Sequence, residues 1–424
     1  MGLEIHLHRV DEVVLGDRHG LDAGRLHLNA AKLRDLVLAD PLFSAVVFEV
    51  VRPGERARIT DVTDVIQPDA DASSWLDPPP GWEPPPRSDR LAGVTVVTAG
   101  EVPYLGGTGL LVPRDAIIDT FGPGGELSPF AEEHHLVLDL EYAAGGTYED
   151  YEAATAAAGL RVAGELAGLA AGLPAAHVTT VESGRIGDLP VVLYACQVHS
   201  QSALLRTRYR GEPADELMPT LISAAELVGG GVTTGGLGAQ SSKITTWAHQ
   251  NNPVVADLVA GHGTRWAFGG VILHRGHYYL FEEKQQVADE ITRLALEAGA
   301  AGVIFTLGGV GNNLIEVMLA IERCERAGIA TVLLAWEQGG PDGDQYPLSY
   351  AVPEAVAVVS TGSLDQPIDL PAADRVVGPP EIRLNAEDPD SGLAAASPLR
   401  LPRRGLLVGA INPLGQLPIG CLEY

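Results

Sequence analysis

The segment Val232–Pro253, VTTGGLGAQSSKITTWAHQNNP, places hydroxyls, amides, one lysine and one histidine close together between two apolar stretches. Its glycines let a backbone approach a ligand closely. A histidine can transfer a proton near neutral pH, and amides and hydroxyls can orient a small polar molecule. A plain connector seldom needs this mixture, so we interpret the segment as a candidate substrate-binding loop.

Three side chains are candidate catalytic groups. His249 lies in WAHQNNP and His199 in CQVHSQ, each at the end of an element and among amides and hydroxyls. Proton transfer is one interpretation, and capping of backbone groups is the other. Lys243 could form an imine if burial lowered its pKa, whereas a surface lysine is the simpler interpretation. The residues expected to bind substrate are Gln201, Thr233, Thr234, Asn251, Asn252, Gly311 and Asn312.

The run GGVGNN (308–313) falls where a strand ends and a helix begins. Such turns line ligand crevices in open α/β sheets, and their free backbone N–H groups can hold an anion. The spacing is not GxGxxG, and no Walker lysine follows. We expect a tight turn in which Gly311 and Asn312 contact substrate or the rest of the protein, while a simple helix cap is the alternative.

No other nucleophile or metal motif stands out. The sequence contains no GxSxG and no HExxH. The adjacent histidines His134 and His135 would point to opposite faces of a strand, so they would not share a metal. We therefore predict no metal site.

Composition excludes several classes of protein. The net charge of −27 disfavours binding to nucleic acid or anionic lipid. Three scattered cysteines without CxxC are typical of a reduced cytoplasm. The N-terminal sequence does not resemble a signal peptide, and no apolar run is long enough to span a bilayer. We expect a cytoplasmic protein.

Strand-like and helix-like segments alternate through most of the chain, which predicts the α/β class. We expect two doubly wound lobes with parallel sheets and a small N-terminal strand-rich unit. The predicted divisions are a strand-rich unit (1–72), a proline-rich linker (73–90), a first lobe (91–255), a second lobe (256–380) and a C-terminal extension (381–424).

Finer patterns predict individual elements. Asn29 should cap one helix, and Thr147 with Asp150 should form a capping box on another. Residues 265–281 resemble a hairpin that turns at Arg275–Gly276, and residues 214–230 resemble a helix interrupted near Pro219.

Several segments in order resemble the component B alpha/beta subunits of the glycine, sarcosine and betaine reductases. They are RPGE with RITDVTDVIQP (52–68), IIDTFGPG with SPF (117–130), MPT (218–220), HQNNPVV (249–255), GVGN (309–312), STGSLDQPIDLPAADRVVG (360–378) and VGAINPLG (408–415). The set covers nearly the whole chain. The proline-rich linker has no clear counterpart.

The resemblance implies a self-cleaving proprotein in which a cysteine becomes a pyruvoyl group. That ketone can hold a substrate amine as an imine, and a partner subunit supplies a thiol or selenol. Aligned without gaps from NNP, the cleaved pair falls on Gly236–Leu237, and leucine has no nucleophilic atom. In a shifted register, the nucleophile could be a hydroxyl of Thr233, Thr234, Ser241 or Ser242. We expect no pyruvoyl cofactor and an uncut chain.

The resulting hypothesis is an enzyme subunit in a hetero-oligomer with a thiol- or selenol-bearing reductase partner, acting on a small polar substrate by reductive or sulfur-transferring chemistry. A noncatalytic scaffold that regulates the partner is the main alternative. An independent small-molecule binding protein is the third.

Overall fold

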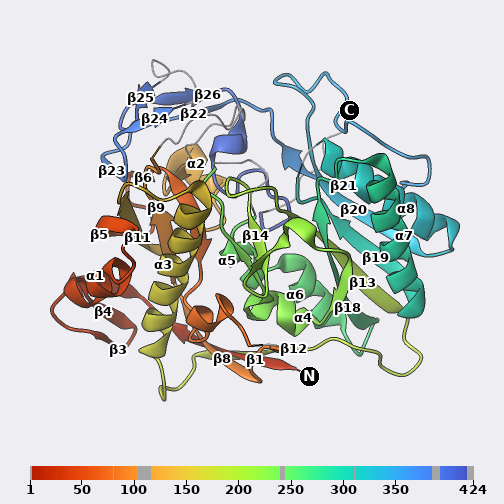
Figure 1. Cartoon of the computed structure of the whole chain (residues 1–424), viewed down its shortest axis with the longest axis horizontal. Coiled ribbons are helices and arrows are strands. Elements are labelled where there is room, and N and C mark those ends of the chain that lie inside the picture. Colours follow the sequence, from red (N-terminus) through yellow and green to blue (C-terminus); the bar gives the residue numbers. More distant parts are fainter. Residues whose placement is uncertain are drawn as a thin grey trace.

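The computed structural model describes residues 2–79, 81–103, 116–238, 244–309, 311–383 and 392–417. The largest sheet among the described residues has six strands (Figure 1). All its neighbouring strands are parallel except the edge strand β16, which is antiparallel to β18. In spatial order the strands are β16 (Thr220–Ile222), β18 (Ala267–Gly276), β13 (Val191–His199), β19 (Ala300–Thr306), β20 (Ala330–Glu337) and β21 (Val358–Ser363).

Strand β13 lies at the point where the strand order reverses, because β18 lies on one side of it and β19 on the other. In open α/β sheets ligands bind beyond the carboxyl ends of the strands at such a point. Helices α7 (Phe281–Glu297) and α8 (Asn312–Arg326) pack against each other and share one core with the sheet. Helix α6 (Pro253–Gly261) belongs to the second core, formed with Tyr194, Cys196 and Val198 of β13. Both faces of β13 are therefore covered.

The second main sheet has four strands, β5 (Phe43–Val51), β11 (His134–Tyr142), β9 (Val94–Ala99) and β7 (Val62–Ile66). The pair β9–β11 is parallel, and the pairs β5–β11 and β7–β9 are antiparallel. The α/β class is confirmed, but the prediction of a parallel sheet in this part of the chain was wrong. The cause is that strands of residues 43–66 pair with strands of residues 94–142, so the N-terminal residues complete this sheet.

Helices α1 (Ala30–Leu38) and α3 (Tyr148–Gly168) contact each other beside the four-stranded sheet (Figure 1). Asn29 caps α1 through its side chain, and Thr147 forms the predicted capping box with Asp150. The other helices are short: α2 (Gly122–Glu126), α4 (Ala224–Glu226), α5 (Thr246–Gln250), and the turns η1 (Ala72–Trp75), η2 (Ala214–Glu216), η3 (Leu227–Gly231) and η5 (Arg404–Leu406).

Small sheets connect distant parts of the chain. The three-stranded ones are β12 (His177–Val181), β1 (Leu3–Arg9) and β8 (Arg87–Ala92); β10 (Ile118–Asp119), β6 (Ala57–Ile59) and β23 (Arg375–Val377); β15 (Glu212–Pro213), β14 (Thr207–Tyr209) and β17 (Val232–Thr234); and β2 (Glu12–Gly16), β4 (Arg25–Asn29) and β3 (Gly20–Asp22). The two-stranded ones are β22 (Ile368–Leu370) with β26 (Leu399–Leu401), and β24 (Glu381–Arg383) with β25 (Gly392–Ala394).

The C-terminal part of the chain returns to its N-terminal half, as the blue strands beside the orange ones show (Figure 1). Strand β23 pairs in parallel with β6. The buried Arg58 of β6 donates to both oxygens of Asp119, at 2.7 and 2.9 Å, and to the carbonyl of Ala395. Three segments separated in the sequence thus meet at one guanidinium group.

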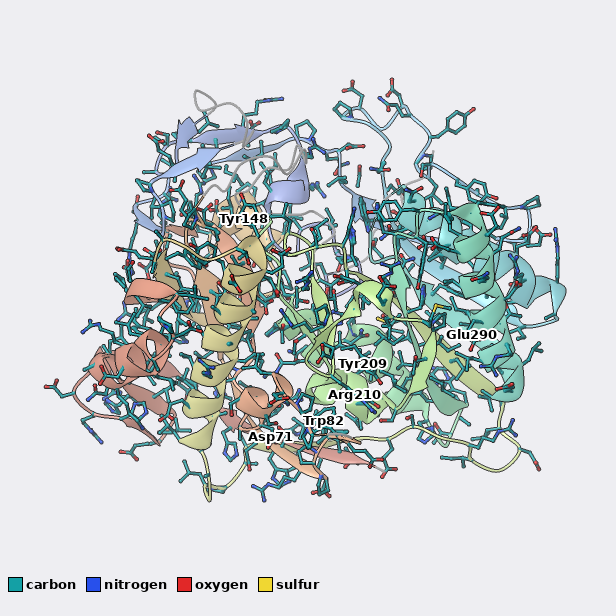
Figure 2. All side chains as sticks on the ribbon, in the orientation of Figure 1. Asp71, Trp82, Tyr148, Tyr209, Arg210 and Glu290 are labelled. Carbon is teal, nitrogen blue, oxygen red and sulfur yellow. The ribbon has the colours of Figure 1, made fainter. Side chains whose placement is uncertain are left out.

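The proline-rich linker is packed on the protein. Trp75 is buried, and a Cβ on Gly230 would overlap its indole ring. Gly230 also has a φ of 95°, which glycine adopts without strain. Trp82, labelled in Figure 2, is also buried, and a Cβ on Gly211, at the turn after β14, would overlap the carbonyl of Leu76 in the linker. The linker therefore supports the turn that leads into the candidate loop.

Two predicted elements were wrong because tertiary pairing overrides local pattern. Residues 267–276 form one straight strand, β18, and not a hairpin, because the strand is held between β13 and β16. The chain leaves the sheet at His277, whose N–H donates to Glu316. Residues 214–230 do not form one helix, because Thr220–Ile222 pairs with β18 as an edge strand.

Candidate functional site

The segment that follows η3 is held against β14 and the turn before it. Strand β17 places Thr234 opposite Thr207. Beyond the strand, the N–H groups of Gly235, Leu237 and Gly238 donate to carbonyls of residues 203–206 at 2.9 Å. A Cβ on Gly235 would overlap Oε1 of Glu152 on α3. Glycine is required at this position because the backbone lies directly against a buried carboxylate.

Helix α5 is fixed by a residue from the N-terminal half. Both oxygens of Asp64 on β7 accept hydrogen bonds from Thr246, one from the backbone N–H at 3.0 Å and one from Oγ1 at 2.6 Å. Thr246 Oγ1 in turn accepts from the N–H of Thr234 at 2.8 Å. A carboxylate at a helix N-terminus satisfies donors that have no partner within the helix. Asp64 therefore sets the orientation of α5 and of His249, which lies three residues later.

A second buried contact holds the other end of α5. The side-chain amide of Gln250 accepts from the backbone N–H of Gln67 at 2.9 Å and donates to the backbone carbonyl of Gln67 at 3.0 Å. Arg90 pairs with Asp69 at 2.6 Å and also donates to the carbonyl of Val228 at 2.6 Å. The N-terminal strands thus position the loop and the short helix together.

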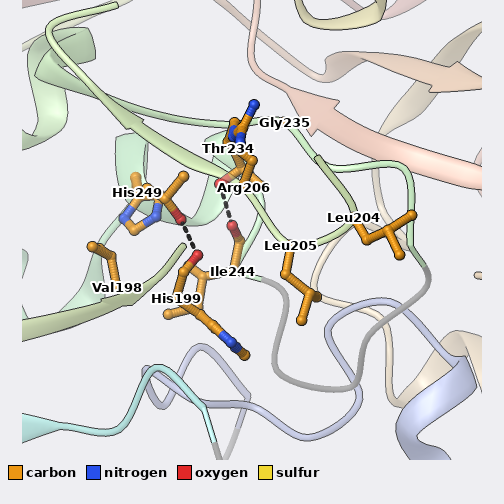
Figure 3. Close-up of a pocket in the computed structure, with 10 residues that line it drawn as sticks. Val198, His199, Leu204, Leu205, Arg206, Thr234, Gly235, Ile244 and His249 are labelled. Carbon is orange, nitrogen blue, oxygen red and sulfur yellow. Dashed lines mark hydrogen bonds between the residues drawn. The ribbon is translucent and has the colours of Figure 1, made fainter. Parts of the chain in front are cut away.

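A small cavity opens between α5, the end of β13 and the turn at residues 204–207 (Figure 3). His199, Arg206, Thr234 and His249 contribute polar side chains to its wall. The complete lining is Val198, His199, Leu204, Leu205, Arg206, Thr207, Thr234, Gly235, Ile244 and His249. A second small cavity also borders Thr234 and Gly235 and includes the carboxylates of Asp64 and Glu152. The candidate loop therefore forms part of the wall of both cavities.

His249 is fully buried, and both of its ring nitrogens lie without a hydrogen-bond partner among the described residues. Burial lowers the pKa of His249 to about 4, so its imidazole is neutral at physiological pH. A neutral imidazole has one donor and one acceptor nitrogen. Leaving such a group unsatisfied costs about 1–3 kcal/mol, which a ligand that bonds to it would recover.

His199 lies at the end of β13, on the same cavity wall (Figure 3). Its backbone carbonyl accepts from Thr207 Oγ1 at 2.8 Å, and its ring stacks on that of His277 with 5.9 Å between centroids. Burial, followed by the nearby His277, lowers the pKa of His199 to about 4, and a hydrogen bond with Gln201 opposes this. The structure brings the two predicted histidines to one cavity.

Arg206 is a cavity residue that the sequence did not single out. Its guanidinium pairs with Asp215 at 2.9 Å and lies 3.6 Å from Glu152, and its buried Nε has no partner among the described residues. Glu152 is also paired with Arg208. The spacing of these residues gave no signal, because the arginines lie on one turn and the carboxylates come from α3 and η2.

The predicted substrate-binding residues divide into two groups. Thr234 lines the cavity, whereas Thr233 is buried opposite Arg208 on the ladder with β14. Asn251 donates to the carbonyl of Trp247 at 2.9 Å. Asn252 caps α6 by accepting from the N–H of Val255 at 3.1 Å, and its amide nitrogen donates to Tyr194 at 3.3 Å. In the described structure both asparagines therefore fix helix ends and do not line either cavity.

The remaining predicted residues lie away from His249 or outside the described ranges. Gln201 donates to the hydroxyl of Tyr279 at 3.1 Å. Gly311, with a φ of 58°, precedes α8, and Asn312 begins that helix with its side chain exposed. Lys243 falls on residues 239–243, which lie outside the described residues.

A different lysine is buried. Lys284 on α7 pairs with Glu316 on α8 at 2.6 Å, just beyond the ends of β13 and β18. Glu316 also accepts from the N–H groups of His277 and Tyr278 at 2.9 and 2.7 Å, and from Gln197 of β13 at 3.3 Å. Burial raises the pKa of Glu316, and Lys284 opposes that shift. The sequence signal for Lys284 was its place on the buried face of an amphipathic helix, in line with Val287, Ala288 and Ile291.

Over the described ranges, three or more histidine, cysteine or acidic side chains nowhere cluster as a metal site would require. His135 is buried and bonded to Thr95, whereas His134 lies on the opposite face of the strand. Within the same ranges no helix has the length and hydrophobicity needed to cross a bilayer.

Comparisons to known proteins place the chain in a family. Residues 1–396 match the family described as glycine/sarcosine/betaine reductase component B subunits, and this chain belongs to that family. It is 31% identical over 391 residues to the sarcosine reductase complex component B subunit alpha of Peptoclostridium acidaminophilum, with 89% of each chain covered. It is 30% identical, with the same coverage, to the glycine reductase complex component B subunits alpha and beta of Acetoanaerobium sticklandii. No solved structure matches the chain significantly.

The residues at the position expected for a pyruvoyl group do not fit one. Leu237 carries only hydrocarbon, is buried, and packs with Val102 and Tyr151. Its N–H is bonded to Ala203. Of the hydroxyls considered as substitutes, Thr234 Oγ1 donates to the carbonyl of Ile244, and Ser241 and Ser242 lie outside the described residues.

Proposed function

We propose that this chain is an uncut subunit of a heteromeric reductase-like complex. It acts on a small polar, amino-acid-like substrate together with a thiol- or selenol-bearing partner, by reductive cleavage or C–S bond chemistry. Family membership supports the assignment to a reductase complex, because the relatives carry the names of sarcosine and glycine reductase complex components.

The observation that carries the proposal is the unsatisfied imidazole of His249 in the cavity beside Thr234 and Gly235. A neutral imidazole can accept a proton at one ring nitrogen and donate a hydrogen bond from the N–H of the other. Arg206 Nε, also buried and unpartnered among the described residues, adds a second donor at the same wall. The cavity has a volume of about 10 Å³, so a water-sized polar group of a substrate is what these side chains could accommodate.

The apolar members of the wall restrict what can bind. Val198, Leu204, Leu205 and Ile244 surround the polar groups, so only a few atoms of a substrate can lie between them. Substrate activation then relies on hydrogen bonding and on the partner's sulfur or selenium, since Leu237 supplies no ketone.

The test is turnover by the reconstituted complex with His249→Asn and His249→Gln. Asn places a polar atom near the position of Nδ1 and Gln near that of Nε2, so the better variant identifies the nitrogen that matters. We expect both to lower kcat by about 100-fold or more, as loss of a general acid or base does. His274→Asn is the matched control, because His274 is equally buried on β18 but lines neither cavity. Equal activity in all variants would support the alternative of a noncatalytic scaffold.

Intact-mass measurement tests whether the chain is uncut. We expect one species near 44.5 kDa. Two fragments that add to this mass, the second with a carbonyl-reactive N-terminus between residues 235 and 242, would contradict the proposal and restore a serine-derived pyruvoyl group.

A further inference from the structure

We propose that an apolar surface at the N-terminus of α7 is where the partner subunit binds. Four large side chains are exposed there: Tyr279 by 71%, Leu280 by 60%, Phe281 by 51% and Met218 by 48%. We call these four residues the α7 patch. Burying such side chains would stabilise a complex, and contiguous exposed apolar residues mark interaction surfaces. This inference rests on the proposed function, which requires a second protein to reach the site.

The residues of the α7 patch are held together by described contacts. Tyr278 donates from its hydroxyl to the carbonyl of Leu217 at 2.8 Å, which ties the segment that carries Met218 to the segment that carries Tyr279. The N–H of Leu280 is capped by Glu283 at 3.1 Å. The backbone of the patch is therefore fixed before a partner arrives, while at least half of each side chain of Tyr279, Leu280 and Phe281 stays exposed. Such preorganisation lowers the entropic cost of binding.

The α7 patch adjoins the candidate site. The hydroxyl of Tyr279 accepts from Gln201, two residues after His199, and its ring packs edge-on against His277 at 5.2 Å between centroids. His277 stacks on His199, which lines the cavity. A protein bound to the patch would thus lie within two side chains of the cavity, close enough for a reactive group on a flexible segment to enter it.

Charge around the α7 patch selects the kind of partner. Glu216 and Glu282 are exposed next to the patch, and Asp215 and Glu283 are partly exposed there. The chain as a whole carries −27. A second copy would bring the same acidic rim against itself, whereas a partner with an apolar centre and basic rim would be complementary. We therefore commit to a different protein, the thiol- or selenol-bearing subunit, as the occupant.

The experiment measures binding of that purified subunit by calorimetry at two salt concentrations. The test variants are Leu280→Ser and Phe281→Ser, both exposed, and serine at position 280 is itself a favourable helix N-cap. The matched control is Leu296→Ser, because Leu296 is 53% exposed at the other end of the same helix. We expect Kd to rise about tenfold or more in each test variant, to stay unchanged in the control, and to rise with salt for the native chain.

The outcomes separate the two proposals. Native binding that neither test variant weakens would overturn the location and leave the proposed function standing. No binding by the native chain would overturn the proposed function and this inference with it. Sedimentation of the chain alone tests whether a second copy of the chain occupies the α7 patch. A native dimer that Phe281→Ser makes monomeric would assign the patch to a second copy and contradict the inference.

Discussion

Asp64 and Thr246 lie 182 positions apart in the sequence, yet the carboxylate of Asp64 accepts both the backbone N–H and the hydroxyl of Thr246. This contact fixes α5 against the N-terminal half of the chain. The position of His249 in the cavity depends on this contact, because α5 carries that histidine.

Replacing Asp64 with alanine should lower the free energy of unfolding. Hydrogen bonds to a charged group contribute about 1.5–3 kcal/mol, so the loss should be in that range. Urea unfolding followed by circular dichroism measures it. Asp369→Ala is the control, because Asp369 makes only an exposed pair with Arg400 and should change stability by less than about 0.5 kcal/mol. Equal effects would mean that the buried contact does not hold α5.

Gly235→Ala should destabilise the chain, because the new Cβ would overlap Glu152. Overpacking of this kind costs about 1–3 kcal/mol. Gly168→Ala is the matched control: Gly168 ends α3 with open space around it, and alanine there should stabilise by about 0.5–1 kcal/mol. Thermal melting compares the two. A neutral Gly235→Ala would show that the loop can move away from α3.

The stability of the chain should depend on the protonation of His249. The unfolded ring takes up a proton near pH 6.5, whereas the folded ring does so only near pH 4. Keeping the His249 ring neutral in the folded state therefore costs no stability above pH 6.5. As the pH falls from 6.5 to 4, the free energy of unfolding decreases by about 1.4 kcal/mol per pH unit on account of this ring.

The test compares the native chain with His249→Asn by urea unfolding at pH 7, 6 and 5. A difference is needed because other groups titrate in the same range. His199 and His274 act in the same direction, whereas burial raises the pKa of Asp71 and of Asp139 to about 6, which acts in the opposite direction. The variant should lose stability less steeply on acidification. Parallel profiles would mean that the ring is solvated and titrates normally.

Lys284→Met should be strongly destabilising, by about 3–5 kcal/mol, because it leaves the carboxylate of Glu316 buried without its cation. Adding Glu316→Gln should recover part of the loss, since it removes the buried charge while the amide oxygen can still accept from one of the two N–H groups, that of His277 or that of Tyr278. A double-variant cycle measures the coupling. If the losses in the free energy of unfolding caused by the Lys284 and Glu316 substitutions simply add, the interaction between the two side chains does not stabilise the fold.

Local patterns predicted much of the secondary structure. Helix caps such as Asn29 and Thr147 depend on residues three apart, so they can be read directly from the chain. The candidate loop stood out because glycines, hydroxyls and a histidine were concentrated in it, and Thr234, Gly235, Ile244 and His249 of it line a cavity, whereas its role in substrate binding stays a prediction. Strand pairing was harder. The pairing of Thr220–Ile222 with β18 depends on which edge of the sheet is free, and no local pattern carries that information.

The sequence by itself determined that Leu237 offers no nucleophile and that the ordered segments belong to a reductase component family. Only the tertiary structure decided which polar side chains face a cavity and which cap helices, separating His249 from Asn251 and Asn252 although the three are nearly adjacent. The physical reason is that an element's orientation is set by distant partners such as Asp64. Residue type alone decides whether a side chain has a nucleophilic atom, whereas the burial and orientation of that side chain arise from packing.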